Sequence, residues 1–73
     1  MTKNIRMCIA SPPDRNELVV EFFQGNEQWA ELNQENGILI LEIYPKRTGE
    51  PWKLDFGQVQ KVLMEGKKKL AGE

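Results

Sequence analysis

One helix-forming segment follows four short strand-forming runs, and this ratio constrains the fold more than any other feature of the sequence. The runs are rich in β-branched and aromatic residues and are separated by turns that contain Gly or Pro. They lie at about residues 4–10, 17–24, 27–33 and 38–44. From about residue 56 to 71 the apolar period becomes 3.6, with Asp55 as a suitable N-cap. The sequence therefore predicts an α+β fold in the order β-β-β-β-α, a four-stranded antiparallel β-meander with one C-terminal helix packed on one face.

The predicted turns indicate which residues share a face of the sheet. A two-residue turn at Gly25-Asn26 sets Phe22 opposite Trp29 and Phe23 opposite Gln28. The first face then carries Val19, Glu21, Phe23, Gln28, Ala30, Leu32, Leu39, Leu41 and Ile43. The second carries Leu18, Val20, Phe22, Trp29, Glu31, Asn33, Ile38, Ile40, Glu42 and Tyr44.

The second hairpin leaves two pairings open. A two-residue turn at Asn36-Gly37 sets Leu32 opposite Leu41, whereas a four-residue turn sets Leu32 opposite Leu39. Both pairings keep the same residues on the same face, because only an odd-length loop reverses the faces.

Both predicted faces are largely apolar, but the chain has only one helix to cover them. A helix of about 16 residues is roughly 24 Å long and 10 Å wide, which covers one side of a small sheet. The other side would expose roughly 400 Å², as much as the largest apolar patches that monomers tolerate. We therefore expect a homodimer, formed through this second face or through an edge strand, and Phe22, Trp29, Ile40 and Tyr44 are the interface anchors if the face is used. The alternative is shielding within the chain, by the first strand, the loop 45–54 or long polar side chains.

The short chain offers few other means of stabilisation. Its 73 residues make one domain, 1–73, which buries only about 60% of the surface that the unfolded chain exposes. Cys8 is the only cysteine and there is no histidine, so a disulfide is excluded and neither a metal nor a cofactor is expected. We expect Cys8 to be a small buried residue. Histidine-based catalysis is excluded too, and Glu31 and Glu42 are better explained as solvated residues than as a catalytic pair, so we expect no enzyme.

Charge is distributed unevenly along the chain. Residues 1–44 carry three basic and seven acidic side chains, a net charge of −4. Residues 45–73 carry seven basic and four acidic side chains, a net charge of +3. We therefore expect the acidic sheet region to bind a basic protein partner. A small non-enzymatic interaction module, of the type of an immunity or antitoxin protein, has this size and charge.

The segment EIYPKRTGEPWKLDF, residues 42–56, contains a possible ligand corner. Tyr44, Arg47 and Trp52 would edge a pocket suited to an anionic or planar ligand, in a binding or enzymatic domain. The favoured interpretation is structural, with Trp52 packed between sheet and helix and Tyr44 ending a strand.

Three segments resemble a known group of proteins. SPPDRNELVVEFF, QWAELNQENG and LEIYPKRTGEPWKLDF, followed by an amphipathic helix that ends in lysines, are similar to a group of short bacterial hypothetical proteins. The resemblance covers most of the chain and implies no catalytic residues and no particular activity.

Two further partners are less favoured. Lys67, Lys68 and Lys69 suggest a nucleic-acid-binding regulator as a weaker alternative, but lysines also complement the helix dipole, and glutamates on the sheet repel phosphates. No apolar run approaches the roughly 20 residues that span a bilayer, and the first residues lack the apolar core of a signal peptide. We therefore expect a cytoplasmic protein with no membrane partner.

Overall fold

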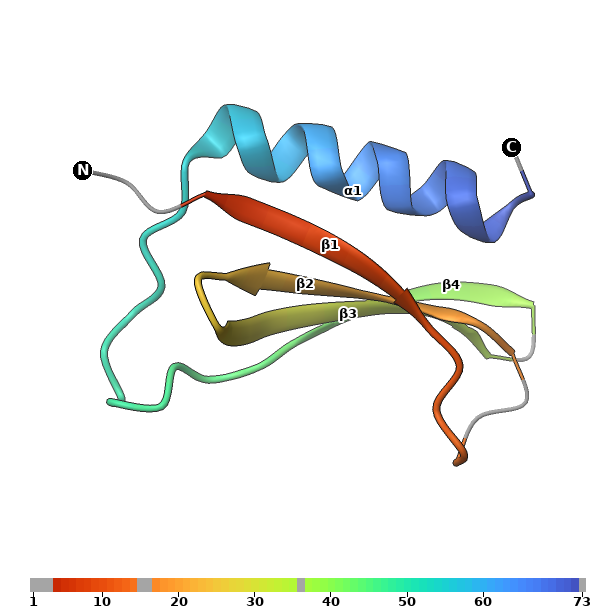
Figure 1. Ribbon diagram of the computed structural model, residues 1–73, viewed down its shortest axis with the longest axis horizontal. Helices are drawn as coiled ribbons and strands as arrows, with labels where there is room; N and C mark the ends of the chain where they lie inside the picture. The colour runs from red at the N-terminus through yellow and green to blue at the C-terminus, as the bar shows by residue number, and fades with distance from the viewer. Residues whose placement is uncertain (1–3, 15–16, 36, 73) are drawn as a thin grey trace.

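The computed structural model describes residues 4–14, 17–35 and 37–72. It contains β1 (Ile5–Ala10), β2 (Val19–Gln24), β3 (Glu27–Glu35), β4 (Ile38–Ile43) and α1 (Phe56–Leu70). The strands form one antiparallel sheet in the order β1-β2-β3-β4, and α1 packs on one face of it (Figure 1). The predicted α+β meander is confirmed, and each element lies within two residues of its predicted bounds.

Local signals at both ends of α1 explain where it begins and ends. The Asp55 side chain accepts a hydrogen bond of 2.9 Å from the backbone N–H of Gln58, as expected of an N-cap. At the other end Gly72 has a φ of 82°, a left-handed conformation that favours glycine and ends the helix.

Gly66 sets the distance between α1 and the sheet. A Cβ atom at this position would lie 3.1 Å from Cζ of Phe22 and 3.3 Å from Cγ1 of Val20. Glycine therefore allows the helix to approach the central strands closely. The core between them consists of the buried residues Ile5, Val20, Phe22, Trp29, Ala30, Leu32 and Val62.

A β-bulge at Trp29 reverses the predicted relation between the faces of β2 and β3. Phe23 pairs with Gln28 next to the turn, as predicted, but Phe22 pairs with Ala30, which leaves Trp29 as an extra residue on β3. Trp29 and Ala30 both join Phe22 in the core, and the rings of Phe22 and Trp29 lie 5.3 Å apart between centroids. The predicted pairing of Phe22 with Trp29 is therefore wrong.

The bulge regroups the residues of the two faces. Val20 and Phe22 lie beneath α1 on the same face as Leu32, because Val20 pairs with Leu32. The opposite face therefore carries Val19, Glu21, Phe23, Glu31, Asn33, Ile40 and Glu42. Val19 and Asn33 are nevertheless buried on that face, so the chain itself covers part of it.

The second hairpin has the tighter of the two pairings. Leu32 pairs with Leu41, and Glu35 pairs with Ile38 across the turn. Asn36 lies outside the described residues, but these pairs agree with a two-residue turn, so the four-residue alternative is wrong.

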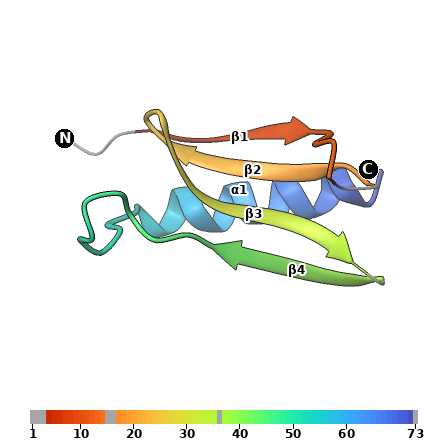
Figure 2. The same ribbon diagram turned by 90° about the horizontal axis from the view of Figure 1, so that it is seen from below.

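α1 leaves one strand of the sheet uncovered. Its backbone approaches β1, β2 and β3 and, within the described ranges, not β4. Figure 2 shows α1 behind the sheet, with β4 at the sheet's lower edge. A single helix is about 10 Å wide, so it spans only about two of the roughly 4.8 Å strand spacings.

Candidate functional site

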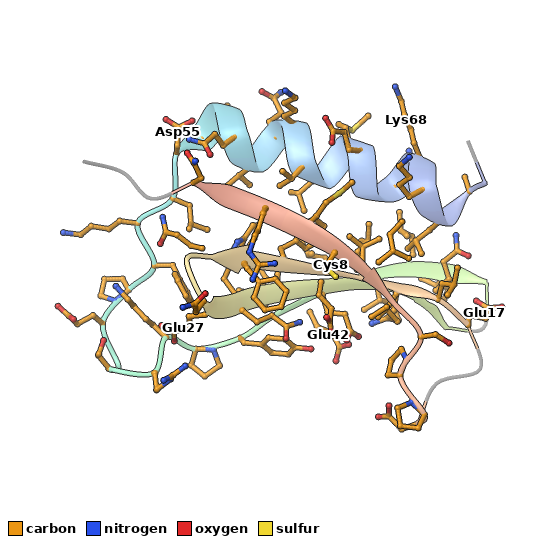
Figure 3. The ribbon with its side chains drawn as sticks, in the orientation of Figure 1. Cys8, Glu17, Glu27, Glu42, Asp55 and Lys68 are labelled. Atoms are coloured by element: carbon orange, nitrogen blue, oxygen red, sulfur yellow. The ribbon has the colours of Figure 1, made fainter. Side chains whose placement is uncertain are left out.

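A row of three glutamates crosses the face of the sheet opposite α1. Glu21 pairs with Glu31 across β2 and β3, and Glu31 pairs with Glu42 across β3 and β4. Figure 3 shows Glu42 on the side of the sheet away from α1. We call these three residues the glutamate row. Like charges directly opposite one another destabilise a sheet, so neighbouring groups must offset the repulsion among these carboxylates.

Asn33 supplies part of that compensation. Its Nδ2 donates to Oε2 of Glu31 at 3.0 Å and to Oε2 of Glu42 at 2.6 Å. Glu31 is 7% exposed and Asn33 is 2% exposed, so this bridge is shielded from water. Hydrogen bonds between an amide and a carboxylate are stronger than neutral ones, and the amide therefore fixes two of the three carboxylates.

One acceptor beside the glutamate row has no donor. Oδ1 of Asn33 is buried and receives no hydrogen bond in the structure. An unsatisfied buried acceptor costs about 1–3 kcal/mol, and Asn33 is only 2% exposed, so this atom is out of reach of a donor from outside the chain in this structure. Glu21 and Glu42 are half-buried, so their carboxylates are the acceptors of this row that an external donor can reach.

The uncovered strand presents a row of three exposed aliphatic side chains. Leu39, Leu41 and Ile43 alternate along β4 on the α1 side and are 40%, 39% and 67% exposed. We call these three residues the β4 strip. Because β4 is last in the strand order, its outer backbone edge has no neighbouring strand among the described residues.

The four predicted interface anchors do not lie on one face. Phe22 is 0% exposed and Trp29 is 3% exposed, both in the core beneath α1. Ile40 and Tyr44 are half-buried, and Ile40 lies on the opposite face with Asn33. The prediction of a common apolar face is wrong, because with the bulge at Trp29 both Phe22 and Trp29 lie in the core beneath α1, where they contribute to the stability of the single chain.

The structure brings together two of the three residues of the predicted ligand corner. Nε1 of Trp52 donates to the backbone oxygen of Tyr44 at 3.0 Å, and Trp52 is half-buried against the core. The backbone N–H of Arg47 instead bonds Oε2 of Glu27 at 2.6 Å, while Nζ of Lys46 lies 5.6 Å from the centroid of the Trp52 ring. These contacts hold the loop against the sheet, and a ligand at this corner stays a prediction.

The remaining predicted residues lie apart from both surfaces or at their margin. Lys67, Lys68 and Lys69 are exposed in the last turn of α1, and nucleic-acid binding through them stays a prediction. Cys8 is exposed and pairs with Glu21, so its predicted burial is wrong, because it lies on the polar face of the edge strand β1. Within the described residues, no three or more His, Cys, Asp or Glu side chains, the glutamate row included, are arranged so that they could hold a metal ion.

The sequence contained signals for both surfaces that a strict period of two does not detect. Trp29-Ala30 is an adjacent apolar pair that interrupts the alternation of polar and apolar residues, and one extra residue in a strand has this effect. This bulge puts Glu21 in line with Glu31. The exposure of the β4 strip could have been predicted by comparing the width of one helix with the width of a four-stranded sheet.

Comparisons with protein-family models, curated proteins and solved structures found no match to this chain. Of the described residues, none belongs to a helix with the length and hydropathy needed to cross a membrane.

Proposed function

We propose that this chain is a small non-enzymatic protein-interaction module that acts as a homodimer. The observation that carries the proposal is the uncovered β4, whose strip of Leu39, Leu41 and Ile43 is exposed at the edge of the sheet. An exposed edge strand with apolar side chains is a ready template for pairing with another chain. A second copy is the simplest partner, because a two-fold contact joins each strip to an identical one.

The proposal selects the edge strand from the two predicted modes of association, the second sheet face and an edge strand. The face opposite α1 carries the glutamate row and is partly buried by the chain, so it offers no continuous apolar surface. The α1 side of β4, in contrast, carries no charged residue between Ile38 and Ile43. Apolar association therefore favours the β4 strip.

Replacing Ile43 with lysine tests this surface. Ile43 is the most exposed member of the β4 strip, so the monomer should tolerate the substitution. A charge brought into the contact from both copies is expected to raise the dissociation constant at least about tenfold, which corresponds to about 1.4 kcal/mol. Sedimentation velocity at a series of protein concentrations up to millimolar measures the change.

Ile9→Lys is the matched control. Ile9 is an exposed isoleucine on the α1 side of the other edge strand, β1. The control is expected to associate as the wild type does. A wild-type chain that stays monomeric at millimolar concentration, or an Ile9→Lys effect as large as that of Ile43→Lys, would contradict the proposal.

A second candidate function is the binding of a basic protein by the glutamate row. Its support is the alignment of three carboxylates across neighbouring strands, two of which, those of Glu21 and Glu42, are only half-buried. Arginine guanidinium groups donate in a planar fork that matches carboxylates, so an arginine-rich surface is the favoured partner. An immunity or antitoxin protein that neutralises a basic toxin belongs to this class.

Titration with an arginine-rich peptide tests the second candidate. Glu21→Gln removes one charge at the accessible end of the glutamate row, and Glu65→Gln removes one charge from the exposed surface of α1. We expect Glu21→Gln to weaken binding several-fold at low salt and Glu65→Gln to have little effect. Equal effects would show that the peptide responds to net charge alone and would reject the row as the site.

A further inference from the structure

The hydrogen-bond pattern of β4 shows which of its backbone groups point outward. The N–H of Tyr44 donates to the backbone oxygen of Trp29 at 2.9 Å, in line with the register that pairs Glu42 with Glu31. Along an antiparallel strand, every second residue makes its backbone hydrogen bonds to the same neighbouring strand. On β4 the even-numbered residues therefore make theirs to β3. The N–H and C=O groups of Leu39, Leu41 and Ile43 therefore point to the outer edge.

In the part of the chain that the structure describes, this edge lacks the usual protection against pairing with another strand. Natural edge strands are often blocked by proline, lysine, a bulge or a covering segment. The strand ILILEI contains no proline and no lysine, and its ladder with β3 contains no register shift. Its only charged residue, Glu42, points to the face opposite the β4 strip.

We infer that two copies pair through β4 in antiparallel orientation, about a two-fold axis at Leu41, to form one eight-stranded sheet. This inference rests on the proposed function and specifies the geometry of its homodimer. Leu41 lies opposite Leu41 of the second copy, and Leu39 lies opposite Ile43 of the second copy. The outward groups of these residues make six inter-copy hydrogen bonds, and their side chains meet on the α1 side.

The neighbouring registers are unfavourable. A residue whose backbone groups point to the outer edge can pair only with a residue of the second copy that does the same. The register can therefore shift only in steps that keep such residues opposite one another. One step sets Glu42 directly opposite Glu42 of the second copy, which places like charges face to face. A step the other way sets Ile43 opposite Gly37, whose φ of 77° is incompatible with a strand. In the inferred register Glu42 meets Ile40 instead.

The size of the contact indicates a reversible dimer. The exposed parts of the three strip residues amount to on the order of 250 Å² per copy, or about 500 Å² in total, whereas stable interfaces bury at least about 1,000 Å². The backbone bonds add direction and register more than area. We therefore expect dissociation constants of tens to hundreds of micromolar.

The pairing also extends the glutamate row. The two rows lie on the same face of the joined sheet, with Glu42 diagonal to Glu42 of the second copy at about 7–8 Å. Their repulsion opposes association and is screened by salt, so the dimer should become tighter as sodium chloride is added. A contact held by ion pairs would show the opposite trend.

Site-specific cross-linking tests the register. Leu41→Cys is made with Cys8→Ser, because the exposed Cys8 would otherwise react. Directly opposed residues in a hydrogen-bonded pair lie about 5.5 Å apart at Cα, within the range that a disulfide spans. Diamide then accepts two electrons and two protons as two thiols form the bond. We expect most of the chain to form covalent dimers when diamide is added near the dissociation constant.

Two matched variants in the same background distinguish the outcomes. Ile43→Cys alone should not cross-link, because the two copies of this residue lie four positions apart, about 13 Å. An equimolar mixture of Leu39→Cys and Ile43→Cys chains should cross-link. A wild-type dimer by sedimentation in which neither Leu41→Cys nor the mixture cross-links would overturn the inferred pairing and leave the proposed function standing. A monomer at millimolar concentration would overturn both.

Discussion

Replacing Phe22 with alanine is expected to destabilise the fold by about 3–5 kcal/mol, the cost of removing a fully buried aromatic ring. Phe22 is 0% exposed, packs beside Trp29 and lies where a Cβ on Gly66 would touch its ring. The side chains of Val20 and Leu32 also lie near Gly66, and the ring of Phe22 is the largest of the three groups there. The loss is comparable to the whole stability of a small domain, so the variant should be largely unfolded in urea titrations followed by circular dichroism.

Phe23→Ala is the control, because it makes the same substitution at the next residue. Phe23 is half-buried on the opposite face, where the guanidinium of Arg6 lies 4.3 Å from its ring centroid. A cation–π contact and partial burial together account for about 1–2 kcal/mol. If the two variants lost the same stability, the assignment of Phe22 to the core face would be wrong.

These two phenylalanines show what the sequence could and could not predict about the fold. The strands and the helix were predicted correctly, because turn residues and apolar periods are local signals. The faces were not, because a period of two assumes an uninterrupted ladder. Trp29 is one extra residue on β3, so beyond it the residues of β3 that share a face with a given residue of β2 are the opposite of those predicted.

The candidate site was predictable only in part for the same reason. Glu31 and Glu42 were placed together on neighbouring strands, and the structure pairs them directly. Glu21 was assigned to the other face, so the full row was not predicted. The bridge from Asn33 depends on side-chain conformation at two cross-strand positions, which no pattern of residue types specifies.

Replacing Asn33 with aspartate is expected to be the second most damaging change. The substitution keeps the shape of the side chain but exchanges the Nδ2 donor, which bonds Glu31 and Glu42, for an oxygen. The carboxylates of Glu31, Glu42 and the new aspartate would then lie together, at a position where the side chain is only 2% exposed. Leaving a buried charge uncompensated costs about 3–5 kcal/mol, and urea titrations at neutral pH should show a loss of this order.

The pH dependence separates repulsion from a change of shape. Burial beside two carboxylates raises the pKa of the introduced carboxyl, because both effects disfavour its charged form. Its protonated form is therefore favoured in the folded state, so the loss of stability should shrink as the pH falls below about 5 and grow as the pH rises.

Adding Glu42→Gln to Asn33→Asp removes one charge and restores an amide donor beside the new carboxylate. We expect the double variant to regain much of the lost stability at neutral pH, since the coupling acts between neighbours in direct contact. A loss that is constant with pH and unchanged by Glu42→Gln would mean that Asn33 acts through packing alone, and that the glutamate row does not need its amide.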